Sequence, residues 1–548
     1  MASRRKKSHN FIIQGGILAI AGVITRIIGL FYRVPVTNII GDEGNGYYAA
    51  AYQIYNIMLL ISSYSLPLAI SKVVSARYSR DEYTNSARVF RGGLIFAFLS
   101  GGVACVLVFF GAEFFASHIM TEPMSAIALR IFAPTLLIVA VMGVIRGYFQ
   151  GMGTMVPTAI SQIIEQIVNA VVSIIAARAL FSYGQKVAAI LLNERYAPAY
   201  GAAGSTLGTS TGALAGLCFL IFTLIVISAS LRREMRWEEN PSVEPMRGIL
   251  KLIFITAVPV ILSTAIYNVS DVLDNGIFNK IMSLKGYEDT KTGIWGIYSG
   301  KYRLLINVPV ALSNAMCSSV VPTLAACMAS DNRRQAKRKV FSAMRFTMLI
   351  AFPCTVGLGV LSEPIMSMLF KGDVKLASEL LRVGCITIIF TSISTLTNGI
   401  LQGINHMELP VRHSIIALVI HVGALYVFLE RLNLGIYGVV YANILFSILM
   451  CIMNQFSIRR ILRYRQEKAR TYIIPALSSA IMGVVVFSIY RVFSKLLGSM
   501  AGTGFAVGFG VLVYFICILK LKGIRKEELY DVPGGSQFVG IAKTLRLM

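Results

Sequence analysis

The sequence predicts an all-α polytopic membrane protein of about 14 transmembrane helices, built as two six-helix lobes related by a parallel repeat plus two extra C-terminal helices. Three features predict this class: a series of long apolar stretches, a low content of charged residues, and a similarity between the two halves of the chain. Only 14% of the 548 residues are charged and 56% are hydrophobic, whereas a soluble protein carries about a quarter charged residues. The composition therefore points to a lipid environment.

Each apolar stretch is long enough to cross a bilayer. The hydrocarbon core is about 30 Å thick, so roughly 20 residues with a rise of about 1.5 Å each span it as a helix. Backbone polar groups cannot stay unpaired in lipid, which makes a helical bundle the expected architecture. The expected spans are residues 11–40, 47–75, 92–112, 125–147, 155–181, 203–230, 248–280, 295–325, 340–362, 376–402, 411–430, 435–458, 471–492 and 501–521.

The distribution of basic residues predicts the orientation. The chain has 51 Lys and Arg against 26 Asp and Glu, a net charge of +25. About 34 of these cations fall on one side of the expected membrane, which by the positive-inside rule places both termini in the cytoplasm. Anionic headgroups attract such loops, so membrane lipids are the expected partners and nucleic acid is not. The basic segments are residues 4–7, 77–91, 232–251, 333–339, 459–470 and 520–526.

A sequence repeat divides the chain. Residues 146–157 and 398–410 share the pattern Gly-x-x-Gln-Gly, followed by Met and by a Pro that opens the next helix. Six helices separate the copies, so both keep the same orientation, as in rocking transporters. We interpret Gln150 and Gln402 individually as parts of tight cytoplasmic turns. The predicted domains are an N-terminal lobe (1–235), a C-terminal lobe (236–465), and the last two spans with a cytoplasmic tail (466–548).

Three of the arginines inside expected spans are candidates for lining a cavity. Arg26 and Arg33 are seven residues apart on one face of the first span, about 10 Å along its axis, and Arg303 lies in the eighth. A charge at mid-bilayer costs roughly 3 kcal/mol, so we expect these side chains to face a water-filled cavity between the lobes. Guanidinium groups fork onto phosphate oxygens, which suits a diphosphate. The alternatives are that Arg33 reaches the outer interface near Asp42 and that Arg303 pairs with an aspartate of the seventh span.

Further polar residues lie beside these arginines. Lys301 is two positions from Arg303, so the two side chains point to nearly opposite sides of their helix. In the seventh span, Asn268, Asp271 and Asp274 form a polar stripe with helical spacing. Lys301 and the three residues of the stripe are candidates for lining the cavity. The two aspartates are also candidates for coupling transport to a monovalent cation or a proton.

The segment 146–166 resembles the Gram-positive branch of the MurJ family, which includes relatives of stage V sporulation protein B, within the multidrug/oligosaccharidyl-lipid/polysaccharide exporter superfamily. The segment 25–33 and the motif formed by Tyr302, Arg303 and Pro309 support the resemblance. It implies a protein of the bacterial cytoplasmic membrane that flips lipid II, with arginines at the Arg26, Arg33 and Arg303 positions lining the cavity and needed for transport. It also implies a lipid-facing groove formed by the last two spans.

Motifs of catalysis are missing from the sequence. It has no P-loop, HExxH or GxSxG pattern, so we do not expect an enzyme or a cofactor. The eight cysteines are scattered through apolar stretches without metal-binding spacing, which indicates neither a metal site nor a disulfide framework. We interpret Glu165 as a helix-packing residue and His421 as a hydrogen-bonded core histidine.

The leading hypothesis is a monomeric flippase that carries an undecaprenyl-diphosphate-linked sugar precursor, lipid II first among them, to the outer leaflet by alternating access. The membrane potential could drive it, because an anion moving outward gains about 2.3 kcal/mol per charge per 100 mV. One alternative is a cation-coupled multidrug exporter of the same superfamily, which would need acidic and aromatic cavity residues. The other is a membrane scaffold that does not transport.

Overall fold

The computed structural model describes residues 2–236, 238, 243–463 and 466–523. Regular structure throughout these ranges is helical, without a strand, so the predicted all-α class is confirmed. The chain forms two compact units, Met1–Gly300 and Lys301–Met548. The tail predicted to lie in the cytoplasm continues past residue 523 and there falls outside the described residues.

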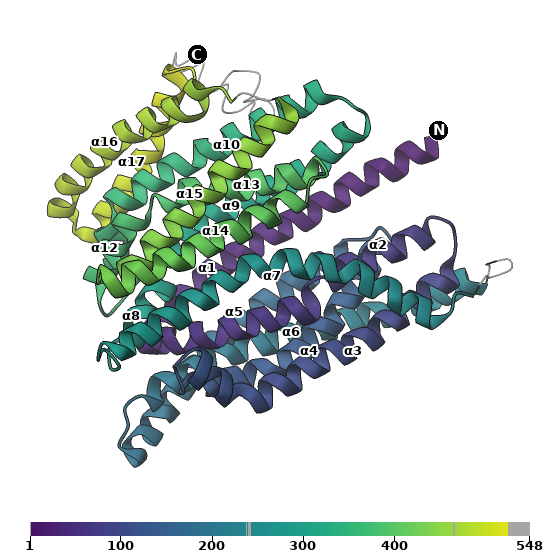
Figure 1. Ribbon diagram of the computed structural model, residues 1–548, viewed down its shortest axis with the longest axis horizontal. Helices are drawn as coiled ribbons and strands as arrows, with labels where there is room; N and C mark the ends of the chain where they lie inside the picture. Colours follow the sequence, from purple (N-terminus) through teal and green to yellow (C-terminus); the bar gives the residue numbers. More distant parts are fainter. Residues whose placement is uncertain (1, 237, 239–242, 464–465, 524–548) are drawn as a thin grey trace. The chain divides into compact units, whose positions relative to one another are not determined.

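The first unit is a bundle in which the long helices α3, α4, α5 and α6 run beside one another (Figure 1). Its core contains Tyr55, Met120 and Phe132, with alanines where helices approach closely. The helices are α1 (Ala2–Leu59), α2 (Leu66–Tyr78), α3 (Tyr83–Phe114), α4 (Ser125–Gly151), α5 (Val156–Leu191), α6 (Tyr196–Arg236), α7 (Met246–Leu284) and α8 (Lys291–Ile297), with π-helical turns η1 (Leu60–Tyr64) and η2 (Phe115–Ile119).

The second unit begins at Lys301, within a further π-helical turn, η3 (Tyr298–Tyr302). Within it α16 and α17 form a pair, and α13 packs on α9 and α15 (Figure 1). The helices are α9 (Arg303–Ala329), α10 (Arg333–Val360), α11 (Ser362–Leu369), α12 (Val374–Gly384), α13 (Thr387–Gly403), α14 (Glu408–Tyr426), α15 (Ile436–Leu462), α16 (Ile474–Leu497) and α17 (Ser499–Lys520), with turns η4 (Val427–Arg431) and η5 (Ala469–Ile473).

Helices α7 and α8 belong to the first compact unit, although the repeat assigns them to the C-terminal lobe. The reason is close backbone packing: Gly296 of α8 lies against the Asp42 carbonyl, and a Cβ on this glycine would come within 2.8 Å of the Gly46 nitrogen. A larger residue at position 296 would push α8 away from α1. The predicted domain boundaries, which follow the duplication, stay a prediction.

The first helix reverses its direction at Gly41. This residue has φ 72° and ψ −176°, a conformation that glycine adopts readily and other residues do not. Arg33 on one side of Gly41 bonds to Tyr48 on the other, and Thr37 bonds to Asn45, so the two segments face each other. The reversal falls between the first two predicted spans.

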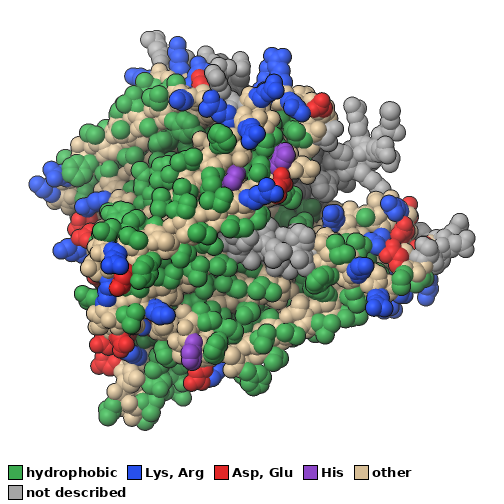
Figure 2. Space-filling model, viewed as in Figure 1, with side chains coloured by type: hydrophobic (Ala, Val, Ile, Leu, Met, Phe, Trp, Pro, Cys, Tyr) green, Lys and Arg blue, Asp and Glu red, His purple; other side chains and the backbone are tan. Residues whose placement is uncertain are grey.

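The described part of the chain contains ten helices long and apolar enough to cross a membrane, or eleven if the pair α12 and α13, bent by 53°, counts as one span. The region Ile20–Tyr78, which covers most of the first predicted span and all of the second, counts as one. The predicted number of 14 therefore stays a prediction. Figure 2 shows hydrophobic side chains over much of the face in view, with charged side chains mostly near helix ends. Exposed aromatic residues such as Phe110 and Phe222 suit contact with lipid tails.

Both copies of the repeated turn have the same geometry. Helix α4 ends at Gly151 and α13 at Gly403, and two residues later φ is positive, 85° at Gly153 and 64° at Asn405. A Cβ on the first terminal glycine would lie 3.0 Å from a carbonyl oxygen of α2, and one on the second 3.1 Å from a carbonyl oxygen of α9. These glycines therefore permit close helix packing, which agrees with the interpretation of both glutamines as turn residues.

Helices α5 and α6 approach each other along a row of small residues. Gly204, Gly208 and Gly212 recur at every fourth position of α6, and a Cβ on any of them would come within 2.7 Å of a backbone atom of α5. Such spacing lets membrane helices pack with their backbones nearly in contact, where dispersion forces replace the missing hydrophobic effect.

Candidate functional site

Arg33 rests on the tyrosines of the returning segment of α1. Its Nη2 donates a hydrogen bond to the Tyr48 hydroxyl at 2.8 Å, and its guanidinium carbon lies 4.5 Å from the centre of the Tyr48 ring and 5.9 Å from that of Tyr52. The two rings stack at 5.8 Å. Within the described part of the chain Arg33 forms no ion pair, so ring faces and hydroxyls hold a guanidinium that still carries an uncompensated charge.

Arg26 lies two turns before Arg33 on the same helix. It is exposed, as are its neighbours Val23, Ile24 and Ile27. Arg26 thus places a cation among exposed apolar side chains of α1. The cavity-lining role predicted for both arginines stays a prediction.

The polar stripe of α7 packs largely against α1. Asn56 donates to Asn268 Oδ1 at 3.2 Å, and Asn275 donates to Gln53 Oε1 at 2.6 Å. Asp274 is buried, whereas Asp271 is half-buried. The amides therefore join α7 to α1, and the half-buried aspartate is the more accessible of the two acids.

The two cations at the start of the second unit differ in burial. Lys301 is 1% exposed, and its ammonium donates to the carbonyl oxygens of Lys371 at 2.7 Å and Asp373 at 3.4 Å. Arg303, two positions later, is half-buried at the first residue of α9. Lys301 thus stabilises the segment before α12, and Arg303 is the more available to a ligand.

Glu165 has the packing role expected of it. Its carboxylate lies 2.8 Å from Arg146 Nη2, and Arg146 Nε donates to Ser161 at 3.0 Å, which ties α5 to α4. His421 is buried and its Nδ1 lies 2.9 Å from the Ala442 carbonyl oxygen, as expected of a core histidine.

We expect Arg146→Ala to destabilise the protein by about 2 kcal/mol, because it leaves a largely buried carboxylate unpaired. The double variant with Glu165→Leu should recover most of the loss, since no lone charge then remains. Thermal unfolding in detergent of both single variants and the double variant measures the coupling. Additive losses would contradict a direct ion pair.

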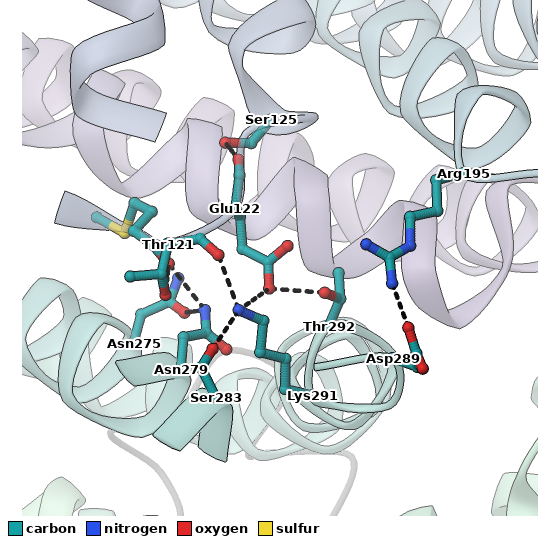
Figure 3. Close-up of polar contacts among 11 residues, drawn as sticks. Thr121, Glu122, Ser125, Arg195, Asn275, Asn279, Ser283, Asp289, Lys291 and Thr292 are labelled. Carbon is teal, nitrogen blue, oxygen red and sulfur yellow. Dashed lines mark hydrogen bonds and ion pairs between the residues drawn. The ribbon is translucent and has the colours of Figure 1, made fainter. Parts of the chain in front are cut away.

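Sequence reasoning missed a buried acid–base pair at the turn before α4. Lys291 Nζ lies 3.9 Å from Glu122 Oε1, and Thr292 donates to the same oxygen at 2.6 Å. Figure 3 shows these side chains from the turn and from α8 pointing toward one another. The partners are distant in sequence and carry no motif, so only the fold brings them together. Within the described residues, no group of three His, Cys, Asp or Glu side chains could hold a metal ion.

An all-α bundle with an internal repeat and arginines on apolar helices defines a polytopic membrane transporter. The family model described as "Polysaccharide biosynthesis protein" matches residues 14–328, more than half of the chain, and the MatE model matches residues 303–427. The chain therefore belongs to the polysaccharide biosynthesis protein family, within the multidrug/oligosaccharidyl-lipid/polysaccharide exporter superfamily. It is a multi-pass protein of the bacterial plasma membrane, and its class is that of transporters and not of enzymes.

Relatives match along nearly the whole chain. "Lipid II flippase MurJ" of Bacillus subtilis (strain 168) is 25% identical over 542 residues, covering 94% of this chain and 96% of the relative. "Stage V sporulation protein B" of the same organism is 22% identical, with the same coverage. The solved structure "Lipid II flippase MurJ, inward closed conformation" has a TM-score of 0.65 at 17% identity, covering 91% of this chain and 97% of that one. At this identity the solved structure supports the fold alone.

Proposed function

We propose that this protein is a flippase that moves an undecaprenyl-diphosphate-linked cell-wall precursor, lipid II first among the candidates, from the inner to the outer leaflet by alternating access. The observation that carries the proposal is Arg33, whose guanidinium is held on Tyr48 and, among the described residues, is not paired with a carboxylate. The full-length similarity to a lipid II flippase supports the same substrate class.

The chemistry of this arginine favours a diphosphate. A guanidinium remains charged when buried and donates two parallel hydrogen bonds to phosphate oxygens. Because Tyr48 already orients the group, less side-chain entropy is lost when an anion binds. Arg26, about 10 Å further along the same helix, would supply a second cation, and Arg303 of the second unit is the third predicted contact.

The coupling and the orientation belong to the proposal. With both termini in the cytoplasm, the anionic cargo would move outward with the membrane potential, a gain of about 2.3 kcal/mol per charge per 100 mV. Asp271 remains the candidate for cation coupling, because it is the less buried aspartate of α7. A monomer with two compact units suffices for this mechanism.

A multidrug exporter is the second candidate, favoured by the MatE match and by a solved multidrug transporter of the superfamily with a TM-score of 0.61. Cationic drugs need carboxylates in the binding site. The first part of α1 carries arginines instead, with no acid before Asp42, so its charge favours anionic cargo.

The test is depletion of the protein in its own cell, followed by an assay of lipid-linked precursors on the cytoplasmic leaflet. We expect one undecaprenyl-diphosphate-linked precursor to accumulate there, and its headgroup identifies the cargo. Purified protein in vesicles should then flip that lipid and not its monophosphate analogue. Unchanged precursor levels together with increased drug sensitivity would favour the multidrug exporter instead.

A further inference from the structure

The turn before α4 is fastened to the hairpin of α7 and α8 by buried polar groups (Figure 3). Glu122 on the turn is 4% exposed, and Lys291 and Thr292 on α8 are 7% and 6% exposed. A second tie lies alongside, where Asn279 of α7 donates to the Met120 carbonyl oxygen at 3.2 Å. The hairpin therefore closes over an ionisable group that water hardly reaches.

The carboxylate of Glu122 is poorly compensated for its burial. Among the described residues its side-chain partners are Thr292, at 2.6 Å, and the Lys291 ammonium, at 3.9 Å, and both face the same oxygen, Oε1. The hydrogen bonds of the ammonium go elsewhere, to the Thr121 carbonyl oxygen at 2.9 Å and to Ser283 Oγ at 2.7 Å. Hydrogen bonds to a carboxylate favour its charged form, and the Glu122 carboxylate accepts one, from Thr292.

The remaining charges around Glu122 largely offset one another. Arg195, just before α6, attracts the carboxylate, but this arginine pairs at 2.5 Å with the exposed Asp289. Glu43 of α1 repels the Glu122 carboxylate, and the charge of Glu122 also acts on the Tyr47 hydroxyl. Lys291 is thus the main cation on this acid, and it is too distant for a hydrogen bond.

We propose that Glu122 is a proton-binding site, and that the α7–α8 hairpin closes over the turn before α4 with uptake of a proton by this carboxyl group. When protonated, Glu122 still bonds to Thr292, because a hydroxyl can accept as well as donate. Lys291 keeps its two neutral acceptors. No buried charge is then left without a hydrogen bond in the closed state.

The direction of the pH effect follows from linkage. Burial raises the pKa of Glu122 from its ordinary value of 4.5 to about 7, and Thr292, Lys291 and Arg195 oppose this only partly. When the hairpin opens, the carboxyl meets water and regains its ordinary pKa, so closing takes up a proton between these two values. Closure is therefore favoured as the pH falls from about 7 toward 4.5, and weakens as the pH rises through 7.

This site provides a coupling element that does not depend on the identity of the cargo. The cluster lies near the reversal of α1 at Gly41, which follows the first predicted span and therefore faces outside when the N-terminus is cytoplasmic. A medium more acidic than the cytoplasm would then hold the hairpin shut, and proton release would accompany its opening.

The test is hydrogen exchange of the backbone amides of residues 284–292 in the full-length protein, corrected for intrinsic exchange at each pH. We expect wild-type protection to rise about 10-fold between pH 8 and pH 6, the ratio that pKa values of 4.5 and about 7 give. Glu122→Gln, which is uncharged at every pH, should retain high protection at both. Arg130→Gln, a control in which the exposed arginine pairs with the exposed Glu113 and not with residues 284–292, should keep the 10-fold rise.

Lower protection in Glu122→Gln would instead identify a simple ion pair between Glu122 and Lys291. If Glu122→Gln lowers protection at every pH, the carboxylate is needed as an anion and the proposal fails. It fails equally if wild-type protection does not change between pH 8 and pH 6. Lys291→Met provides a second measurement should the glutamine variant not fold: loss of the nearby cation should move the midpoint upward by about 1 pH unit. An unmoved midpoint would assign the titration to another group.

Discussion

Arg33→Ala is expected to slow transport severely while leaving the protein folded. If the guanidinium binds the diphosphate of the cargo as proposed, the variant loses a charge-assisted contact worth about 2–5 kcal/mol, a decrease in flipping rate of about 30-fold or more. The effect on folding should be small, because Arg33 has no carboxylate partner among the described residues to be left unpaired. The measurement is the flipping rate of the lipid-linked precursor in vesicles, together with complementation of a depleted strain.

Two further variants separate charge from geometry. Arg33→Lys keeps the charge and loses the planar fork, so we expect partial activity. Tyr48→Phe keeps the ring and removes the 2.8 Å hydrogen bond that orients the guanidinium, which should weaken substrate affinity more than the maximal rate. The matched control is Arg130→Ala, since Arg130 is an exposed arginine whose carboxylate partner, Glu113, is also exposed. Equal losses in Arg33→Ala and Arg130→Ala would rule out Arg33 as the anion site.

Local patterns were sufficient to predict the fold class and the repeat. The turn after Gly151 and its copy after Gly403 share residues within a few positions of each other, and the structure gives both the same backbone geometry. Apolar length likewise predicts helices without knowledge of their neighbours. The environment of Arg33 could not be predicted in this way. Tyr48 is visible in the sequence, but its contact with Arg33 depends on how the chain turns at Gly41.

The pair formed by Glu122 and Lys291 was beyond sequence reasoning for the same reason. Glu122 stands in a short turn and Lys291 near another, where charged residues are normally solvated. Both are buried where α7 and α8 contact the turn before α4. The differing roles of Lys301 and Arg303 were partly predictable, because two positions on a helix point to different sides, but the carbonyl acceptors of Lys301 lie about 70 residues away.

Gly208→Ala should be among the most destabilising small substitutions in the first unit. The new Cβ would overlap Ser173 Oγ and lie 2.6 Å from the Ser173 nitrogen and 2.7 Å from the Asn169 carbonyl oxygen. Backbone atoms cannot move aside as a flexible side chain can, so α6 must shift from α5 or Ser173 must give up its bonds to Asn169 Oδ1 and the Ser205 carbonyl oxygen. We expect a loss of about 3 kcal/mol.

The matched control for that substitution is Gly102→Ala on α3, where an added Cβ meets no atom within 4 Å. There the methyl group adds only helix propensity, which should raise the free energy of unfolding by up to about 1 kcal/mol. This variant should therefore unfold at or slightly above the wild-type temperature. Thermal unfolding of both variants in the same detergent makes the comparison. If Gly208→Ala unfolds together with Gly102→Ala, the close approach of α5 and α6 does not hold the bundle, and the small-residue row on α6 needs another explanation.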